Sequence, residues 1–507
     1  MTSPISIVDL FSGPGGLGEG FASIREDDTP AYKIAISIEK ERAAHSTLRL
    51  RAFLRHFATP PRAYLDWLRS GGEMPDWAAL HPEAWAEACQ EARCLELGTA
   101  EAAQVLEERI TALQSAQQTR TLLIGGPPCQ AYSLAGRSRN AGIPSYDALK
   151  DHRNFLYEEY VRVLNRLEPV AFVMENVKGI LSSSIEGRAI FSMVMSDLRA
   201  AGPGYQLISL SAPTDLSGEP APKDFIVRAE DFGVPQTRHR VIIVGIRSDV
   251  AARLPKDRLP RLSPSRERIS VARMISRMPG LRSGLSRSDS AEHWRAAMLA
   301  AIDQVRSSMA DSPADRRDAF EKELREVERS LNDIVTCGRE STGLTVMKPD
   351  LPARLASWIS GRSSGIVANH DTRGHMASDL ARYLFAACHA KLEGISPRAG
   401  NFPPALAPDH RNWTSGKFND RFRVQLAHQP ATTITSHISK DGHYFIHPDP
   451  SQCRSLTVRE AARLQTFPDD YVFLGNRTEQ YVQVGNAVPP WLARQIAEAL
   501  IPVYDSL

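Results

Sequence analysis

The sequence predicts an α/β protein in which a doubly wound, Rossmann-like sheet domain is joined to a second, smaller domain of mixed structure. Short apolar segments of strand character alternate with segments of helical periodicity as far as residue 246, which is typical of a mostly parallel sheet covered by helices. From residue 247 that alternation stops, and Pro, Ser and Gly interrupt the chain up to about residue 422. These observations predict one large sheet domain and one separate domain.

The elements of the sheet domain follow one another in a regular order. A buried strand is expected at 5–11 (ISIVDLF), and a glycine-rich turn at 12–18 leads into a helix from about Glu19. The next strand, 34–38, ends at Glu39, so the chain opens with a strand–helix–strand unit. Further strands are expected at 121–124, 171–174 and 241–246, with a helix over 154–167.

Two segments depart from this order. Residues 42–118 are rich in Ala, Glu, Gln, Leu and Trp at helical spacing, and we interpret them as a helical insert in the sheet domain. After residue 455 the chain becomes regular again, with helices expected at 458–465 and 491–500. The predicted organisation is a sheet domain at 1–246, a second domain at 247–422 and a C-terminal segment at 423–507.

The composition argues against several classes of protein. The 507 residues are 42% hydrophobic and 24% charged, which is ordinary for a globular chain of about two to four domains. The six cysteines form no CxxC pair, and no apolar run approaches the ~18 residues of a membrane span. The N-terminus enters an apolar strand without the regions of a signal peptide. We therefore expect a cytoplasmic protein without a membrane partner.

The overall charge does not point to a nucleic acid. The formal charge is only +2, from 61 basic and 59 acidic side chains. The basic residues include 11 Lys, which leaves 50 Arg, the residue that grips phosphates and bases in a bidentate manner. Codon usage explains this excess equally well. Residues 247–288, with eleven basic and three acidic side chains, are a candidate track for phosphates, and a solvated charged face is the alternative.

The glycine-rich turn predicts a cofactor site. FSGPGGLG, residues 11–18, matches GxGxxG between a strand and a helix, and its glycines allow the backbone to approach a ligand closely. Glu39 lies 21 residues past Gly18, at the end of the next strand, where a carboxylate can bind ribose hydroxyls. The pattern indicates a nucleoside-containing cofactor and leaves NAD, FAD and S-adenosylmethionine open, with a turn that binds nothing as the alternative.

Two later strands end in reactive or polar side chains. Cys129 follows the strand 121–124 and the stiff sequence Gly-Gly-Pro-Pro, a frame that favours a nucleophile over a buried structural cysteine. Glu175 follows the strand 171–174 and can act as an acid, a base or a hydrogen-bond reader, or it can cap a helix. The sequence therefore predicts an active site at the carboxyl ends of these strands.

Two further motifs flank these residues. Arg238 and Arg240, in the sequence QTRHR, lie two residues apart in an extended segment, where both side chains point to one side and can hold an anionic or carbonyl-rich group. Gln483–Pro490 (QVGNAVPP) forms a fixed turn before the last helix, in which Asn486 can cap the helix or reach a ligand.

Together these motifs resemble the cytosine-C5 DNA methyltransferase family of bacterial restriction–modification systems. The resemblance covers about 1–41, 121–246 and 421–507. Its stretches are DLFSGPGGLGEGF, IEK, GGPPCQAYS, DHRNFLYEEY, MENVKG, DFGVPQTRHRVIIVG, REAARLQTFPDDY and QYVQVGNAVPP. Eight stretches in the family's order are far more specific than any one of them, and they imply methylation of cytosine with S-adenosylmethionine, which leaves as S-adenosylhomocysteine.

The resemblance implies a role for each catalytic position. Cys129 matches the cysteine that adds to C6 of cytosine, which makes C5 nucleophilic toward the methyl group. Glu175 matches the glutamate that binds the N3 edge, and Arg238 the arginine that binds O2. Arg240 is expected to order the neighbouring backbone and the target strand. The base must be flipped out of the duplex to reach these groups.

The resemblance also implies the binding residues. The cofactor positions are Phe11, Gly13, Pro14, Gly16, Glu39, Pro128, Leu156, Asn486 and Val488. The expected DNA contacts are Ser133 and Arg137, in a segment that resembles the family's mobile loop, and Gln236. Residues 247–422 stand where the family keeps its target recognition domain, so double-stranded DNA is the expected partner.

The sequence departs from the family in two places. The aspartate expected to bind the adenine amino group is missing, and Glu96 is the candidate substitute. The distance from Glu39 to Cys129 is long, which we assign to the insert at 42–118. Elsewhere, the cluster from Asn369 to His375 has no cysteine and no zinc spacing, so we expect a polar network and no metal.

Several functions remain open. The first is a DNA (cytosine-5-)-methyltransferase in restriction–modification or phage defence, with a cognate endonuclease or defence proteins as possible partners. The runner-up is the same chemistry on tRNA, against which the large second domain argues. A silent DNA-binding homologue conflicts with the intact Cys129, Glu175 and Arg238, and an NAD-dependent oxidoreductase rests only on the first turn and Glu39.

Overall fold

The computed structural model describes residues 3–128, 156–185, 188–211, 220–345, 347–362, 365–408, 413 and 419–507. Among these, no helix is long and apolar enough to cross a membrane.

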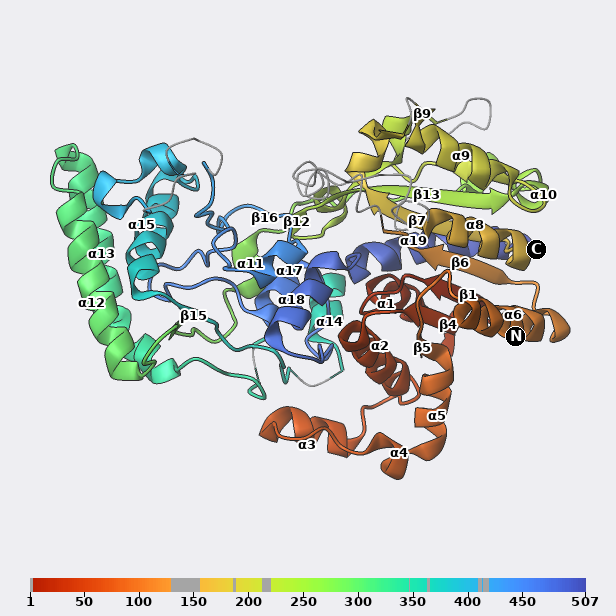
Figure 1. Ribbon diagram of the computed structural model, residues 1–507, viewed down its shortest axis with the longest axis horizontal. Coiled ribbons are helices and arrows are strands. Elements are labelled where there is room, and N and C mark those ends of the chain that lie inside the picture. The colour runs from red at the N-terminus through yellow and green to blue at the C-terminus, as the bar shows by residue number, and fades with distance from the viewer. Residues whose placement is uncertain are drawn as a thin grey trace.

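An eight-stranded sheet forms the centre of the larger domain (Figure 1). Its strands are β1 Ile5–Leu10, β4 Tyr32–Glu39, β5 Ala92–Cys94, β6 Thr121–Gly125, β7 Ala171–Val177, β10 Tyr205–Ile208, β11 Ile226–Arg228 and β13 His239–Arg247. The order is β10-β13-β7-β6-β1-β4-β5, with β11 beside β13. Neighbours from β5 to β7 pair in parallel, and β13 pairs antiparallel with β7, β10 and β11. The predicted α/β class and its strands are confirmed.

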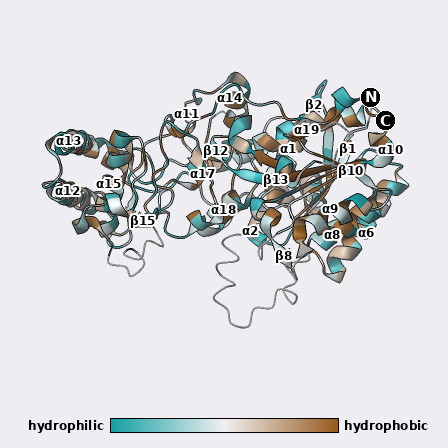
Figure 2. Ribbon diagram, turned by 90° about the horizontal axis from the view of Figure 1, so that it is seen from above, coloured by the Kyte–Doolittle hydropathy of each residue, from teal (hydrophilic) through white to brown (hydrophobic). Residues whose placement is uncertain are grey.

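Helices bury the sheet on both faces, which explains why its strands are continuous apolar runs and not alternating ones. All six residues of β1 are buried. Helices α6 (Ala100–Ser115), α8 (Leu156–Leu167) and α9 (Ile190–Ala200) share one hydrophobic core with one face of the sheet. Helices α1 (Gly16–Ala22) and α19 (Pro490–Tyr504) pack on the other face. The hydropathy colours of Figure 2 show the hydrophobic strands within this layered arrangement.

The predicted helical insert is only partly helical. Its helices are α2 Arg42–Leu54, α3 Arg62–Ser70, α4 Trp77–Leu80, α5 Pro82–Glu91 and α6. The prediction is wrong at Ala92–Cys94, which form the edge strand β5 beside the end of β4. Three residues are too few to show a strand period in the sequence, so only pairing with β4 reveals them.

The second domain has its own hydrophobic core at the far end of the molecule (Figure 1). Helices α12 (Ala291–Ser308), α13 (Ala314–Cys337) and α15 (Ala377–Glu393) form it, and Phe320 stacks on Phe385 with ring centroids 5.5 Å apart. The segment 250–278 does not belong to this core. Its apolar side chains, among them Leu254 and Met274, pack with the core of the sheet domain, so the second core begins well after the predicted boundary at 247.

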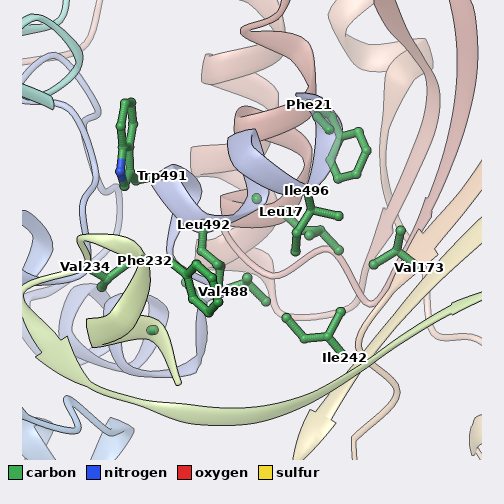
Figure 3. Packing of buried hydrophobic residues seen from close by; sticks show 14 of the residues in the cluster. Leu17, Phe21, Val173, Phe232, Val234, Ile242, Val488, Trp491, Leu492 and Ile496 are labelled. Carbon is green, nitrogen blue, oxygen red and sulfur yellow. The ribbon is translucent and has the colours of Figure 1, made fainter. Parts of the chain in front are cut away.

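The C-terminal segment returns to the sheet. Helices α17 (Val458–Leu464) and α19 agree with the predicted helices 458–465 and 491–500. Helix α18 (Arg477–Asn486) was not predicted, and the turn expected at Gln483–Pro490 is helical as far as Asn486. Figure 3 shows Leu492 and Ile496 of α19 packed beside Leu17 and Phe21 of α1. The N-terminal and C-terminal parts of the chain therefore share one core.

The remaining elements are short. They are β2 Arg25–Glu26, β3 Thr29–Pro30, β8 Ser184–Ile185, β9 Arg188–Ala189, β12 Gln236–Thr237, β14 Gly284–Leu285, β15 Gly374–His375, β16 Ala431–Thr432, α10 Ser248–Ala251, α11 Val271–Ile275 and α14 Ala353–Ser360. Short 3-10 turns lie at 178–182, 222–225, 229–232, 256–258, 399–401, 404–406 and 436–439.

Candidate active site

The glycine-rich turn between β1 and α1 has an unusual backbone. Phe11, Gly13 and Gly15 have φ angles of 56°, 58° and 96°, a region that is costly for a side chain such as that of Phe11. A Cβ atom added at Gly13 would meet no atom within 4 Å. The turn therefore leaves open space above Gly13, as close contact between a ligand and the backbone requires.

Glu39 lies beside this turn. Its carboxylate accepts hydrogen bonds from the backbone N–H groups of Gly13 and Glu41, each at 2.7 Å. The side chain is largely buried, and burial raises its pKa above the usual value. The two ends of β1 and β4 are thus tied together at the edge where a nucleoside was predicted to bind.

Glu96 lies near the same edge. Strand β5 pairs Cys94 with Glu39, and two residues later the Glu96 carboxylate is 3.4 Å from Lys40 Nζ, with both side chains exposed. Its position next to Glu39 agrees with the expected replacement of the missing aspartate, which stays a prediction.

The C-terminal segment closes the turn from the other side. A Cβ atom added at Gly16 would lie 2.4 Å from the backbone oxygen of Val488, so only glycine allows this close approach. Val488 is buried, and Asn486, at the end of α18, is exposed. Pro128 and Leu156 are half-buried at the ends of β6 and α8. Phe11, Gly13, Pro14, Gly16 and Glu39 therefore follow the carboxyl ends of β1 and β4, and Val488 lies against Gly16.

The backbone that leads to Cys129 is held against Glu175. Asn176 Nδ2 donates to the carbonyl of Pro127 at 3.2 Å. A Cβ atom at Gly126 would lie 3.1 Å from Glu175 Oε2, so the glycine lets the two strand ends meet. Cys129 itself lies outside the described residues, as do Ser133 and Arg137.

Glu175 and Arg240 form an ion pair. Arg240 Nε is 2.9 Å from Glu175 Oε1, because the antiparallel register of β13 and β7 places Arg240 opposite Val177, near the end of β7. Burial lowers the pKa of Arg240, and the nearby carboxylate opposes that shift. The guanidinium therefore fixes one oxygen of the carboxylate.

Arg238 is more deeply buried, with 2% of its surface exposed. Its Nη1 donates to the carbonyls of Ile434 at 2.8 Å and Gly485 at 3.3 Å. Its Nε has no hydrogen-bond partner among the described residues, and burial lowers its pKa. Arg238 thus joins the sheet to the C-terminal segment while keeping donor capacity for a ligand.

Gln236 occupies a different environment from the one expected. Its side chain is completely buried; Nε2 donates to the carbonyl of Leu464 at 3.2 Å and to Gln465 Oε1 at 2.5 Å, and Oε1 accepts from the backbone N–H of Ile434 at 2.8 Å. The predicted DNA contact does not fit this position, because a side chain with no exposed surface and an occupied amide cannot reach a nucleic acid. Gln236 instead links β12 to the C-terminal end of α17 and to Ile434.

The polar cluster around His370 is part of the protein interior. His370 bonds Thr457 Oγ1 at 2.9 Å, and burial lowers its pKa to about 4. Arg373 donates to the carbonyls of Ile438 and Lys440. No group of three or more His, Cys, Asp or Glu side chains suited to a metal occurs in the part of the chain that the structure describes.

The basic stretch 247–288 is partly neutralised by local ion pairs. Arg247 pairs with Asp249, Arg268 with Asp231, Arg273 with Glu267, and Arg282 with Asp289. Asp249 and Glu267 belong to the segment and are already counted in its charge, whereas Asp231 and Asp289 lie outside it and neutralise two further arginines. Contact with phosphates stays a prediction.

Two residues near the turn stand in the quoted motifs but were assigned no role in the sequence analysis. Asp9, inside β1, is buried, and burial raises its pKa to about 7. Tyr471 reaches the turn from the segment after α17 and donates to the carbonyl of Pro14. A carboxylate inside an apolar strand was a usable signal for Asp9, whereas nothing in the sequence places Tyr471 beside Pro14.

Comparisons with known proteins agree with this geometry. A family model described as C-5 cytosine-specific DNA methylase matches residues 101–502. The type II methyltransferase M.Bpa9945I of Bacillus paralicheniformis is 33% identical over 517 residues, covering 98% of this chain and 99% of that protein. The DNA (cytosine-5-)-methyltransferase M.ApeKI of Aeropyrum pernix is 26% identical, covering 76% of this chain and 82% of that protein.

A solved structure has a similar fold. It is the crystal structure of a prophage-encoded E. coli protein described as a DNA modification methyltransferase, with a TM-score of 0.54 at 19% identity and with 99% of both chains covered.

Proposed function

Because the chain belongs to the C-5 cytosine-specific DNA methylase family and is a cytosine-5 DNA methyltransferase, we propose that it methylates a flipped cytosine in a specific duplex sequence. The reaction proceeds through a covalent bond between Cys129 and C6. The Glu175–Arg240 pair beside the backbone that leads to Cys129 is the observation that carries the proposal.

The nucleophile in this proposal is the thiolate of Cys129. The S–C6 bond forms while the electrons of the C5=C6 double bond move to C5. C5 then takes a methyl group, and loss of the C5 proton to a base returns the electrons to the double bond and expels the thiolate. Gly126 and Pro127, which precede Cys129 in the sequence, lie beside Glu175 and Asn176.

Glu175 and the two arginines hold the cytosine in this proposal. Glu175 binds the N3 edge with its free carboxylate oxygen, since Arg240 occupies the other one. Arg238 binds O2, and the positive charge withdraws electrons from the ring. Fixing these groups in advance lowers the barrier, because no reorganisation is then needed in the transition state.

The residues around the glycine-rich turn fit S-adenosylmethionine for two reasons. There is open space above Gly13, and the Glu39 carboxylate lies beside that space, where it accepts from the Gly13 N–H. The bound cofactor supplies an electrophilic methyl group and leaves as S-adenosylhomocysteine. Glu39 holds the ribose, and Phe11, Pro14, Gly16, Pro128, Leu156, Asn486 and Val488 surround the rest of the cofactor.

The substrate in this proposal is double-stranded DNA. Ser133 and Arg137 contact phosphates, which positions the protein on the duplex. The second domain reads the base edges, which specifies the sequence. Together these contacts hold the duplex while the target base is flipped out. The enzyme acts in the cytoplasm on nucleoid DNA, and it protects that DNA beside a cognate endonuclease in restriction–modification or defence.

One experiment tests this function. Wild-type protein is incubated with tritiated S-adenosylmethionine and duplex DNA of mixed sequence, with a parallel reaction on tRNA and a matched Cys129→Ala protein. We expect label in DNA with the wild type and none with Cys129→Ala. DNA that carries 5-fluorocytosine, which has no C5 proton to lose, should stay attached to the wild type in denaturing gels.

The controls separate the alternatives. Incorporation of the tritium label into tRNA but not into DNA favours the tRNA reaction. Equal labelling by Cys129→Ala contradicts the covalent step. No labelling of any DNA by the wild type, over many sequence contexts, contradicts the function itself.

A further inference from the structure

The glycine-rich turn is held from below by a tyrosine of the C-terminal segment. Tyr471 is 1% exposed, and its hydroxyl donates to the backbone carbonyl of Pro14. Pro14 is the residue between the two turn glycines with positive φ, Gly13 and Gly15. The orientation of the peptide that follows Pro14 therefore depends on a side chain that is 457 positions away in the sequence.

The fit between the turn and this tyrosine is tight. A Cβ atom added at Gly15 would lie 2.9 Å from the Tyr471 hydroxyl and 2.7 Å from Leu48 Cδ1. Leu48 of α2 and Tyr471 therefore lie so close to the turn that only glycine fits at position 15.

An ion-pair network in turn fixes the tyrosine. The Arg51 guanidinium lies over the Tyr471 ring, 4.9 Å from its centroid. Arg51 binds both oxygens of Glu19, at 3.0 and 2.6 Å, and one oxygen of Asp470 at 3.0 Å. Glu19 belongs to α1, Arg51 to α2 and Asp470 to the segment after α17, so one buried cation joins three parts of the chain beneath the turn.

The hydroxyl also keeps its proton. Burial raises the pKa of Tyr471 well above its usual value, so the group remains a donor at any physiological pH. On the opposite side of the turn, Glu39 accepts from the N–H of Gly13. The cofactor turn is thus held at Gly13 by the N-terminal half and at Pro14 by the C-terminal segment.

We propose that Tyr471 is a positioning residue for the cofactor turn, which presets the Gly13–Gly16 backbone in the form that binds S-adenosylmethionine. This inference rests on the proposed function, since it concerns the same cofactor. The hydroxyl of Tyr471 bonds the backbone of the turn, so in this proposal its loss acts on cofactor affinity through that backbone.

Tyr471→Phe tests the inference, because it keeps the ring and removes only the hydroxyl. Loss of one buried hydrogen bond should raise the Kd and the KM for S-adenosylmethionine about fivefold to tenfold. The KM for DNA and the kcat should change less than twofold. Isothermal titration with S-adenosylhomocysteine and steady-state methylation measure these values.

Tyr504→Phe is the matched control. Its hydroxyl donates to the carbonyl of Thr121 at 2.9 Å, also in the interior, but at the other end of the sheet. We expect a similar loss of stability with unchanged cofactor affinity. An unchanged KM for S-adenosylmethionine in Tyr471→Phe, or an equal loss of affinity in both variants, overturns the inference.

A second variant covers the case in which Tyr471→Phe does not fold. Arg51→Lys keeps the positive charge but cannot bind Glu19 with two parallel hydrogen bonds, and it should raise the same KM about threefold. A folded Arg51→Lys protein with wild-type KM then overturns the inference. Absence of cofactor binding by the wild type instead contradicts the proposed function.

Discussion

Many ionisable side chains in the interior of this protein form ion pairs. Some of these pairs lie at the candidate active site, as Glu175–Arg240 does, and others lie inside the scaffold, as Arg463–Asp469 does. Glu175 and Arg240 were each predicted from a motif, but their contact depends on the antiparallel pairing of β7 and β13. Gln236 comes from the same motif as Arg240, yet it lies wholly inside. Motif membership therefore does not by itself separate a site residue from a structural one, because the Gln236 amide is fully buried and already hydrogen-bonded inside the protein.

Asp9 differs from these residues because its Oδ1 has no hydrogen-bond partner among the described residues, and its pKa is raised to about 7 by burial. The folded state therefore holds a proton that the unfolded state releases near pH 3.8. The stabilisation that the protonated Asp9 carboxyl adds to the free energy of unfolding is fully present below pH ~3.8, and it is lost as the pH rises toward 7.

Asp9→Asn removes this titration while keeping the shape of the protonated side chain. We expect the free energy of unfolding of the wild type, relative to Asp9→Asn, to fall by about 2–3 kcal/mol between pH 5 and pH 8. Urea unfolding at pH 5, 6, 7 and 8 measures it. The exposed Asp249→Asn is the control, and its difference from the wild type should not vary over this range, since Arg247 lowers the pKa of Asp249. A constant difference for Asp9→Asn contradicts the assignment.

Close contact between helices positions the elements around the cofactor turn. Helix α1 approaches α19 so closely that a Cβ atom at Gly20 would lie 2.4 Å from Ala493 Cβ and 2.5 Å from the backbone nitrogen of Arg494. Sequence periodicity predicted both helices, but it did not predict which helix covers which. The edge strand β5 was missed for a related reason, because pairing with β4 and not its own composition makes it a strand.

Gly20→Ala should push these two helices apart. Backbone atoms cannot yield as a flexible side chain can, so we expect a loss of about 1–3 kcal/mol in stability, seen as a lower urea midpoint. Gly400→Ala is the matched control, because a Cβ atom there meets nothing within 4 Å. Equal midpoints for both variants would show that α1 and α19 separate freely.

In the part of the chain that the structure describes, the largest hydrophobic clusters form two main cores, one on the two faces of the sheet and one in the second domain. The sheet core takes residues from both ends of the chain and from 250–278. The second core holds Trp294, Phe320, Phe385 and Phe422. Residues of α2, α3 and α4 join Ile366 and Val472 in a smaller cluster, so the segment called an insert supports the region between the two cores.

Phe320→Ala tests whether the two cores have separate roles. Loss of a buried ring costs about 3–5 kcal/mol in the second core, and we expect DNA affinity to fall at least tenfold while S-adenosylhomocysteine binds normally. Gel shift and isothermal titration measure the two affinities. Leu344→Ala, at a side chain that is 58% exposed, should leave both unchanged. A parallel loss of both affinities in Phe320→Ala would mean that the two cores act as one.

The sequence by itself determined the α/β class, the main strands and the positions of Glu39 and Glu175, because buried parallel strands are apolar runs and polar residues near their ends are conspicuous. Arg238 was found from its motif, before the antiparallel strand β13. Tertiary structure alone decided the Glu175–Arg240 contact, the burial of Gln236 and the hold of Tyr471 on Pro14. These features depend on sheet register and on helix packing between residues far apart in the chain. Local sequence patterns report what each segment prefers, whereas such contacts exist only after the segments have packed together.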